Sequence, residues 1–462
     1  MPRKASALLA GPILAILAVP ALLAIGLAPD AAWTAGVTLL CAIWWVSEAL
    51  PLAATGLVPF AAFPLLGILD HKQVAHAYGH YLILLFLGGF MMSKAIEKNG
   101  AHRRLALGML GLVGKAGRRG VLLGFMVATA ATSMWISNTA AVLMMLPVAQ
   151  AILLSDDRED LRVPLLLGIA YAGSIGGIGT PIGTPPNMTF MAVYETATGN
   201  DPVTFVEWMT WGVPVVLLMI PIAWLILGRR VSPGGQLSIP DPGPWQPAER
   251  RVLAVFALTA LAWVLRDLPI AGGGLTGWFG WTGIGDDTIA LCGAIALFVL
   301  PSGEEDGSRL LDWKTAEQIP WGILILFAGG LAIAEAFKVS GLSTVIGEGL
   351  TAFAGMPPIL LVLGLCLGVT FMTEVTSNTA TTALLMPILA AAAPATGLDA
   401  RVLMVPAAMS ASCAFMLPVA TAPNAIVFGT GSVRIADMVR EGFWLNLAGA
   451  AVIGGVCWGL LG

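Results

Sequence analysis

The sequence predicts an all-α polytopic membrane protein, because of its composition, its many long apolar segments and an internal repeat. Charged residues make up 11% of the 462 residues, against roughly 25% in soluble domains. Hydrophobic residues make up 57%, and the mean hydropathy is +0.87. This composition excludes a soluble enzyme and a disordered chain. The net charge of -4 argues against a nucleic-acid partner, which would require a basic surface.

Eleven apolar segments are candidate transmembrane helices. They lie at 8–28, 33–49, 52–69, 80–98, 163–194, 209–228, 251–268, 287–301, 319–337, 402–430 and 443–461. The first could be a cleaved signal peptide, because it follows the basic residues Arg3 and Lys4. We interpret it as a retained helix, since its apolar run is longer than a usual signal core and many spans follow it.

The distribution of basic residues predicts the orientation of the chain in the membrane. With the N-terminus in the cytoplasm, 19 Lys and Arg residues fall on the cytoplasmic side and only four outside: Lys72, Arg266, Lys338 and Arg401. Cytoplasmic loops normally carry this excess of positive charge. We therefore expect a protein of the cell (inner) membrane with its N-terminus cytoplasmic and its C-terminus outside.

The two halves of the chain repeat each other in three blocks that occur in the same order. Residues 82–100 match 323–341, residues 136–147 match 376–387, and residues 183–187 match 420–424, at offsets of 241, 240 and 237. The predicted topology makes the first repeat enter from the cytoplasm and the second from outside. The sequence therefore predicts an inverted repeat, which is the arrangement of many secondary transporters.

Each repeat contains a stretch that should interrupt a transmembrane helix. The Gly- and Pro-rich residues 176–187 and the residues 417–424, which contain Pro418 and Pro423, cannot continue as regular helix. Irregular backbone at membrane depth is tolerated where protein or a water-filled cavity surrounds it. We predict two broken helices, and a simple proline kink is the alternative for each.

Two further segments, 121–154 and 357–396, are too long for one crossing of a core of roughly 30 Å. Each has the tripeptide Ser-Asn-Thr at a polar centre, at 137–139 and 377–379. Two helices joined at this tripeptide would form a re-entrant hairpin with its tip near the midplane. The alternative is that each segment crosses the membrane twice. The distribution of basic residues is compatible with a hairpin and with two crossings.

The paired tripeptides suit the binding of a small cation and a dianion. Ser hydroxyl, Asn amide and backbone carbonyl oxygens can surround Na+ without a formal charge, while amide and hydroxyl donors can bind carboxylates. Neither motif contains Lys or Arg, so bound cations and helix dipoles would offset the charge of an anion. The alternative is that these polar residues only join neighbouring helices.

These motifs resemble the divalent anion/Na+ symporter family, which comprises sodium-coupled dicarboxylate, citrate and sulfate carriers. The resemblance covers roughly residues 35–462. It is carried by both Ser-Asn-Thr motifs, by WWVSEALPLAATGLVP at 44–59 and by the pattern Ala411-Ser412-x-x-Phe415-x-x-Pro418-Val419-Ala420-x-x-x-Asn424-x-Ile426-Val427. It implies a homodimeric elevator-type transporter with about 11 transmembrane helices, in which a transport domain moves against a scaffold.

The resemblance also implies a division of the chain. Residues 1–119 would form scaffold helices and a cytoplasmic connecting helix, and 120–200 the first hairpin and broken helix of the transport domain. Residues 201–340 would return to the scaffold, with the loop 229–250 between the repeats. Residues 341–442 would form the second hairpin and broken helix, and 443–462 the last helix.

By matching motifs, the family implies at least two Na+ sites and one substrate site. One Na+ would lie near Ser133, Ser137, Asn138 and Gly179, and the other near Thr373, Thr376, Asn378 and Ala420. Substrate carboxylates would contact Asn138, Thr139, Thr180, Asn378, Thr379, Thr421, Ala422 and Pro423. The family often has two prolines before Asn424, and Ala422 departs from that pattern. Glu374 could tune the second cation site or serve as a structural hydrogen-bonding group.

The function that the resemblance implies is Na+-driven import of C4 dicarboxylates such as succinate, malate and fumarate. The protein would be surrounded by membrane lipid. A Na+-independent dicarboxylate exchanger and a sulfate or citrate carrier of the same family are the alternatives. A proton-linked antiporter would require an unpaired intramembrane carboxylate, and only Glu374 comes close. A membrane-embedded enzyme would require a nucleophile and base or metal ligands, which the sequence does not place together.

Overall fold

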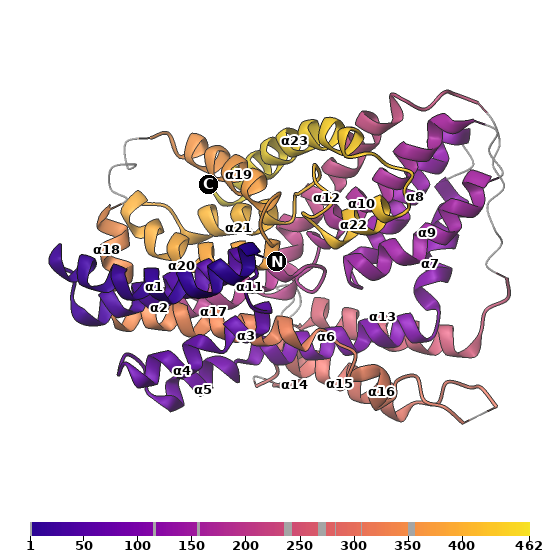
Figure 1. The fold of residues 1–462 in the computed structure, drawn as a ribbon. Helices are drawn as coiled ribbons and strands as arrows, with labels where there is room; N and C mark the ends of the chain where they lie inside the picture. The colour runs from indigo at the N-terminus through magenta and orange to yellow at the C-terminus, as the bar shows by residue number, and fades with distance from the viewer. Residues whose placement is uncertain are drawn as a thin grey trace.

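The structure is a computed structural model that describes residues 2–113, 117–154, 158–234, 243–266, 274–281, 283–305, 307–349 and 356–462. Within these ranges the chain is helical, apart from one isolated β-bridge between Pro301 and Arg309. The all-α class that the sequence predicts is confirmed. Figure 1 shows the arrangement of the helices.

The first repeat provides α1 (Pro2–Ala24), α2 (Pro29–Ser47), α3 (Leu52–Gly56), α4 (Val58–Leu65), α5 (His71–Tyr78), α6 (Tyr81–Lys98), α7 (Ala101–Val113), α8 (Gly117–Ser133), α9 (Asn138–Leu154), η1 (Glu159–Leu161), α10 (Arg162–Gly177), α11 (Pro185–Thr198) and α12 (Phe205–Gly228). The second provides α13 (Pro247–Leu265), α14 (Gly274–Phe279), α15 (Asp286–Val299), α16 (Trp313–Ala316), α17 (Trp321–Val339), α18 (Leu342–Gly349), α19 (Pro358–Thr373), α20 (Asn378–Thr396), α21 (Ala400–Ala411), α22 (Ala422–Gly429) and α23 (Ile435–Leu461).

Both predicted helix breaks are present. The segment 163–194 forms α10 and α11, which are separated by residues 178–184, and the segment 402–430 forms α21 and α22, which are separated by 412–421. Each second half-helix begins with proline in its first turn, where the missing N–H costs no hydrogen bond. Glycine and proline thus end one helix and begin the next in both repeats.

The segments with a central Ser-Asn-Thr each form two helices joined by a turn of four residues. The first helix pair is α8 and α9 with the turn 134–137, and the second helix pair is α19 and α20 with the turn 374–377. The helix–turn–helix form agrees with the expectation from the sequence. Whether each pair is re-entrant in a membrane stays a prediction.

The helices group into two bundles. In the first bundle, α8, α10 and α12 pack against one another, as do α19, α21 and α23, and α12 also packs on α23. In the second bundle, α6 packs on α15, α15 on α13, and α17 on α3, α4 and α5. The first bundle occupies the upper half of Figure 1, and α3–α6 and α13–α16 the lower half. The expected division into scaffold and transport segments stays a prediction.

The two repeats pack on each other reciprocally. The second half-helix of the second repeat, α22, packs against α9 and α10 of the first repeat. The equivalent helix of the first repeat, α11, packs against α20 and α21, which are the counterparts of α9 and α10. The second half of each broken helix therefore packs against the other repeat.

Six helical stretches of the described chain are long and apolar enough to cross a membrane. They are Ser6–Ala24, His71–Lys98, Phe205–Gly228, Trp321–Val339, Asn378–Thr396 and Ile435–Leu461. Four shorter apolar stretches, Leu52–Leu65, Asn138–Leu154, Pro358–Thr373 and Ala400–Ala411, accompany them. The number of about 11 transmembrane helices stays a prediction, since broken helices cannot be counted by length.

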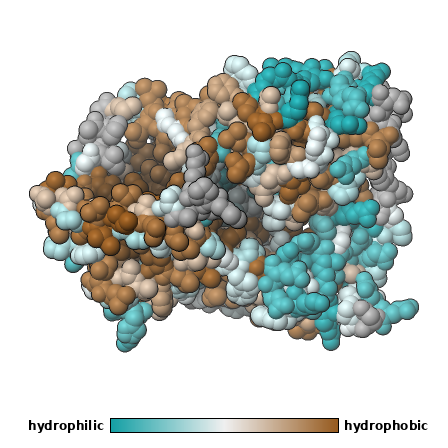
Figure 2. Space-filling model, in the orientation of Figure 1, coloured by the Kyte–Doolittle hydropathy of each residue, from teal (hydrophilic) through white to brown (hydrophobic). Residues whose placement is uncertain are grey.

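Hydrophobic residues cover the left and centre of the surface in Figure 2, and hydrophilic residues gather at its right-hand end.

Candidate functional site

The serine of each Ser-Asn-Thr motif begins the second helix of its pair. Ser137 Oγ accepts a hydrogen bond from the Ala140 N–H at 3.2 Å, and Ser377 Oγ accepts one from the Ala380 N–H at 3.5 Å. Serine is a preferred residue at this position because its short hydroxyl reaches a free N–H of the first turn. The following asparagine is thus the first residue of α9 in one repeat and of α20 in the other.

Each asparagine amide contacts a buried hydroxyl that also contacts the first half of a broken helix. Ser133 Oγ lies 2.7 Å from the side-chain amide of Asn138 and 2.7 Å from the Gly173 carbonyl of α10. Thr373 Oγ1 lies 2.6 Å from Asn378 Oδ1 and 3.0 Å from the Ala411 carbonyl of α21. We call these two groups the Ser133 cluster and the Thr373 cluster.

The Thr373 cluster is rich in oxygen and poor in protons. Its hydroxyl carries one hydrogen, yet two acceptors, Asn378 Oδ1 and the Ala411 carbonyl, lie within 3.0 Å of it. Three oxygen atoms without a formal charge therefore converge around one proton. Such a set suits a hard monovalent cation, which prefers oxygen ligands.

Three oxygens converge on the side-chain amide in the Ser133 cluster as well. Hydrogen bonding assigns the amide nitrogen of Asn138 to a position 2.7 Å from Ser133 Oγ, 3.2 Å from the Gly173 carbonyl and 3.1 Å from the Gly183 carbonyl. The nitrogen therefore occupies a point that three oxygen atoms surround. A rotation of the amide would place its oxygen at that point instead, as a fourth oxygen beside the other three.

A second pair of asparagines holds the two helix breaks in shape. Asn187 Nδ2 donates to the carbonyls of Gly177 at 2.9 Å and Thr180 at 2.7 Å. Asn424 Nδ2 donates to the carbonyls of Ala414 and Leu417, both at 3.0 Å. Both asparagines are fully buried. Their amides satisfy carbonyls that lose helical partners where the helix ends.

Glu374 fixes the second helix break to its surroundings. Its Oε1 accepts hydrogen bonds from the N–H groups of Phe415 at 2.7 Å and Met416 at 2.9 Å, and from Asn446 Nδ2 at 2.7 Å. Its Oε2 accepts one from the Leu417 N–H at 3.0 Å. The carboxylate is buried, and four donors compensate its charge. This geometry supports the structural alternative for Glu374.

The two breaks differ in exposure. The first break, including Gly179 and Thr180, is buried, and the Thr180 hydroxyl donates to the Met134 carbonyl. In the second break Thr421 is half-buried and Ala422 is exposed, while Ala420 and Pro423 are buried. Thr139 and Thr379 are half-buried at the starts of their helices. The second repeat therefore leaves more of its predicted substrate residues open to the surface.

Two predicted cation ligands have other partners in this structure. The Ser137 hydroxyl accepts the capping bond described above, and Thr376 Oγ1 donates to the Met372 carbonyl at 2.8 Å and lies 2.7 Å from Thr381 Oγ1. The structure thus brings Ser133 to Asn138 and Thr373 to Asn378. It leaves Ser137 and Thr376 engaged within their own helix pairs.

Sequence reasoning did not assign roles to Asn187, Asn424 and Asn446. A signal for the first two was present, because they end the matched blocks 183–187 and 420–424. Asn446 had no such signal, since its contact with Glu374 joins residues 72 positions apart. In the described residues no group of three or more His, Cys, Asp or Glu could hold a metal ion.

Sequence comparison finds a family model described as a citrate transporter, which matches residues 42–405. The sodium-dependent dicarboxylate transporter SdcS of Staphylococcus saprophyticus is 39% identical, over 96% of this chain and 89% of the relative. A protein of the same name from Staphylococcus aureus strain RF122 is 41% identical, over 92% and 85%.

Solved structures of transporters share the fold. The YdaH transporter of Alcanivorax borkumensis has a TM-score of 0.61 and 15% identity, covering 85% of this chain and 89% of that one. MtrF of Neisseria gonorrhoeae, described as an antimetabolite efflux pump, has a TM-score of 0.59 and 13% identity, covering 83% of each chain. The family match and the apolar helices together identify the chain as an integral membrane transporter. The chain belongs to the divalent anion/Na+ symporter family of carriers.

Proposed function

We propose that this protein couples inward movement of Na+ to the import of C4 dicarboxylates such as succinate, malate and fumarate. The observation that carries the proposal is the pair of matching oxygen clusters, one in each repeat. The names of the relatives, sodium-dependent dicarboxylate transporters, support the choice of ion and substrate class.

In this proposal one Na+ binds in each cluster. Ser133, Asn138 and the Gly173 and Gly183 carbonyls surround the first ion, and Thr373, Asn378 and the Ala411 carbonyl surround the second. Binding turns the Asn138 amide so that its oxygen faces the ion and its nitrogen becomes free for a carboxylate. The ion thereby prepares a donor for the substrate, which would couple the two binding events.

The dianion would bind between the two turns, with one carboxylate toward each. Asn138 and Thr139 would contact one end, Asn378 and Thr379 the other, and Thr180 and residues 421–423 would border the site. The N-termini of α9 and α20 lie at these residues, and helix N-termini favour anions. The exposed Ala422 leaves space beside the site where a larger side chain would project.

We further propose that transport follows an elevator mechanism in a homodimer with a cytoplasmic N-terminus. The moving unit would be the first bundle. It would include α12 and α23, because these helices pack on α8, α10, α19 and α21. This boundary places α12 with the transport segments, although the family resemblance implied that 201–340 belongs to the scaffold.

The test is uptake of radiolabelled succinate into proteoliposomes that contain no internal succinate. An inward Na+ gradient should drive uptake, and equal gradients of K+ or choline should not. Uptake that occurs only after preloading with succinate, without Na+ dependence, would replace the symporter by an exchanger. If neither condition gives uptake, sulfate and citrate replace succinate as the substrates to test, and the C4 proposal fails.

A further inference from the structure

Each repeat places a pair of glycines on an equivalent helix, at 88–89 on α6 and at 329–330 on α17. Three residues before the second glycine of each pair lies a phenylalanine, Phe86 or Phe327, and the two rings contact each other with centroids 5.7 Å apart. Contact between equivalent residues is what a two-fold relation produces. The two glycine pairs therefore occupy matching places on either side of this contact.

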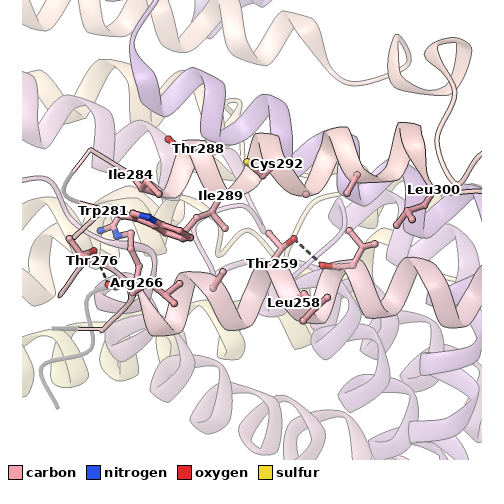
Figure 3. Close-up of a pocket in the computed structure, with 15 residues that line it drawn as sticks. Leu258, Thr259, Arg266, Thr276, Trp281, Ile284, Thr288, Ile289, Cys292 and Leu300 are labelled. Atoms are coloured by element: carbon pink, nitrogen blue, oxygen red, sulfur yellow. Dashed lines mark hydrogen bonds between the residues drawn. The ribbon is translucent and has the colours of Figure 1, made fainter. Parts of the chain in front are cut away.

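The first glycine of each pair fixes its helix within the second bundle. A Cβ atom on Gly88 would lie 2.8 Å from the carbonyl carbon of Ala290 in α15, and one on Gly329 would lie 2.6 Å from the Gly56 carbonyl oxygen in α3. α15 packs in turn on α13, which lies beside it in Figure 3. Other helices of the same bundle therefore hold α6 and α17, and the second glycine of each pair has a fixed position.

The second glycines have different surroundings. A Cβ atom on Gly89 would lie 3.0 Å from Ile182 Cγ2 and 3.6 Å from Ile182 Cβ, so the first helix break packs directly against α6. Beyond its own helix and among the described residues, a Cβ atom on Gly330 would meet Ala383 Cβ at 3.8 Å. The second break is thus absent from the place that corresponds to the contact of the first.

Val419 is the counterpart of Ile182 in the second break. Each follows a proline and comes directly before the matched blocks 183–187 and 420–424. Ile182 is 6% exposed, whereas Val419 is 81% exposed. Two β-branched side chains in the same place of the repeat therefore have opposite surroundings, because α6 covers one and the described part of the second bundle leaves the other uncovered.

The first bundle, by contrast, holds the two breaks in the same way. A Cβ atom on Gly212 of α12 would lie 2.5 Å from the Ile178 carbonyl oxygen, and one on Gly442 of α23 would lie 2.3 Å from the Phe415 carbonyl oxygen. These two carbonyls are equivalent, at the offset of 237 that relates the blocks around the breaks. The difference between the breaks therefore lies in their contact with the second bundle.

The helices beside the breaks show the same difference. α17 packs on α11 and α20. The equivalent contacts would join α6 to α22 and α9, and the described parts of these helices form no comparable ones. Ala383 of α20 is fully buried, whereas its counterpart on α9, Leu143, is 52% exposed. Contacts with the second bundle are thus divided unequally between equivalent residues in two separate places.

We propose that Gly89 and Gly330 are alternate docking positions for the two helix breaks, and that one of them is occupied at a time. In this structure Gly89 receives Ile182. In a second arrangement Gly330 receives Val419, and the first break leaves α6. Leu143 then comes into contact with α6. The repeat supports this exchange, because equivalent residues can form an equivalent set of contacts. The inference rests on the proposed movement of the first bundle, but it holds for any transported substrate.

Alanine at either glycine should shift the balance between the two arrangements in opposite directions. In Gly89→Ala the added methyl group would crowd Ile182, so this variant should favour the second arrangement by at least about fivefold. In Gly330→Ala the methyl group fits this structure at an ordinary contact distance and occupies the place of Val419, so it should favour the arrangement described here. Gly455→Ala is the control, because no described atom lies within 4 Å of its methyl group.

Disulfide cross-linking of the intact protein in membranes detects both arrangements. Gly89→Cys and Ile182→Cys should form a disulfide, since their Cβ atoms would lie 3.6 Å apart and about 3.5–4.5 Å is required. Gly330→Cys and Val419→Cys should form one as well, although this structure shows no contact between them. All variants carry Cys292→Ser, which removes an exposed thiol. Variants with one introduced cysteine control for disulfides between two copies.

The alanine variants add a rate to this test. In Gly89→Ala the disulfide between Gly330→Cys and Val419→Cys should form at least about fivefold faster than in Gly455→Ala. A maleimide should label Val419→Cys, introduced alone, more slowly in Gly89→Ala than in Gly455→Ala, because docking covers this position.

No disulfide between Gly330→Cys and Val419→Cys would overturn the proposal, whether or not the protein takes up succinate. Equal rates in Gly89→Ala and Gly455→Ala would overturn it too. Circular dichroism verifies folding, and if Gly89→Ala does not fold, the disulfide in the background without an alanine substitution decides. Both disulfides without succinate uptake would support the docking exchange and reject the proposed substrate.

Discussion

The Ser133 and Thr373 clusters combine the same three groups, a hydroxyl, an asparagine amide and a backbone carbonyl, although the hydroxyl comes from serine in one repeat and threonine in the other. The hydroxyl oxygen is the shared element, and the threonine methyl group is not. Substitutions at Thr373 can therefore separate loss of the oxygen from a change in side-chain volume.

We expect Thr373→Val to raise the Na+ concentration that half-saturates uptake by roughly 10- to 100-fold, because a neutral group that contacts a charge contributes about 1.5–3 kcal/mol. Thr373→Ser should retain Na+ affinity within a few-fold, since Ser133 supplies the same atom in the other repeat. Na+ titrations of succinate uptake measure both. An unchanged Na+ response in Thr373→Val would remove Thr373 from the cation site.

Glu374→Gln tests whether this carboxylate holds the helix break or binds the ion. The amide replaces one acceptor by a donor that would face the N–H groups at 415–417. We expect a loss of stability of about 1.5–3 kcal/mol and slower transport, with the half-saturating Na+ concentration nearly unchanged. Glu304→Gln, at an exposed carboxylate, is the control for thermal unfolding. A large shift in Na+ affinity with normal stability would instead make Glu374 a cation ligand.

At the scale of single elements, glycine residues allow helices to pack in close contact with neighbouring backbone near the two breaks. A Cβ atom on Gly442 of α23 would lie 2.3 Å from the Phe415 carbonyl oxygen and 2.4 Å from its carbon. A Cβ on Gly176 of α10 would lie 2.3 Å from the Ala130 carbonyl of α8. In both places the neighbour is backbone, which cannot move aside as a side chain does.

Gly442→Ala should therefore displace the second break and destabilise the protein by about 1–3 kcal/mol, as overpacking does in other cores. Gly459→Ala on the same helix has no atom within 4 Å of the added methyl group. It should be neutral or slightly stabilising, because alanine favours helix over glycine by about 1 kcal/mol. Thermal unfolding of the detergent-purified variants compares the two, and equal melting temperatures would contradict the packing argument.

At the scale of the whole molecule, a hydrogen bond joins α6 of the second bundle to α11, which packs on α20 and α21 and lies in the proposed transport segment 120–200. The Tyr81 hydroxyl at the start of α6 donates to Glu195 Oε2 near the end of α11. If α11 moves together with the first bundle against the second, this contact must separate during each cycle. By contrast, Lys98 Nζ and Asp312 Oδ2, which lie 2.6 Å apart, both belong to the second bundle and should stay together.

We therefore expect a cross-link between Tyr81→Cys and Glu195→Cys to block uptake, and reduction of the cross-link to restore it. The matched pair Lys98→Cys and Asp312→Cys should cross-link without loss of transport. A Cys292→Ser background removes the one exposed thiol, since Cys41, Cys366, Cys413 and Cys457 are buried. Normal uptake by the cross-linked Tyr81–Glu195 pair would argue against rigid movement of the first bundle.

The sequence by itself determined the helical class, the two helix pairs in which Ser-Asn-Thr begins the second helix, the two helix breaks and the repeat that relates them. These features follow from local chemistry, because apolar runs form helices, glycine and proline interrupt them, and serine caps them. The family also followed from the sequence, since its motifs are contiguous. The sequence also predicted four ligands that the structure places in contact as two pairs, Ser133 with Asn138 and Thr373 with Asn378. Their role as ligands stays a prediction.

Only the tertiary structure decided which polar groups meet across the chain. The Gly173 and Ala411 carbonyls reach the clusters from positions 40 and 38 residues away, and Asn446 reaches Glu374 from 72 residues away. The grouping of α12 with the first bundle likewise depends on packing. Local propensity sets where helices begin and end, whereas the partners of a buried polar group depend on which helices pack around it.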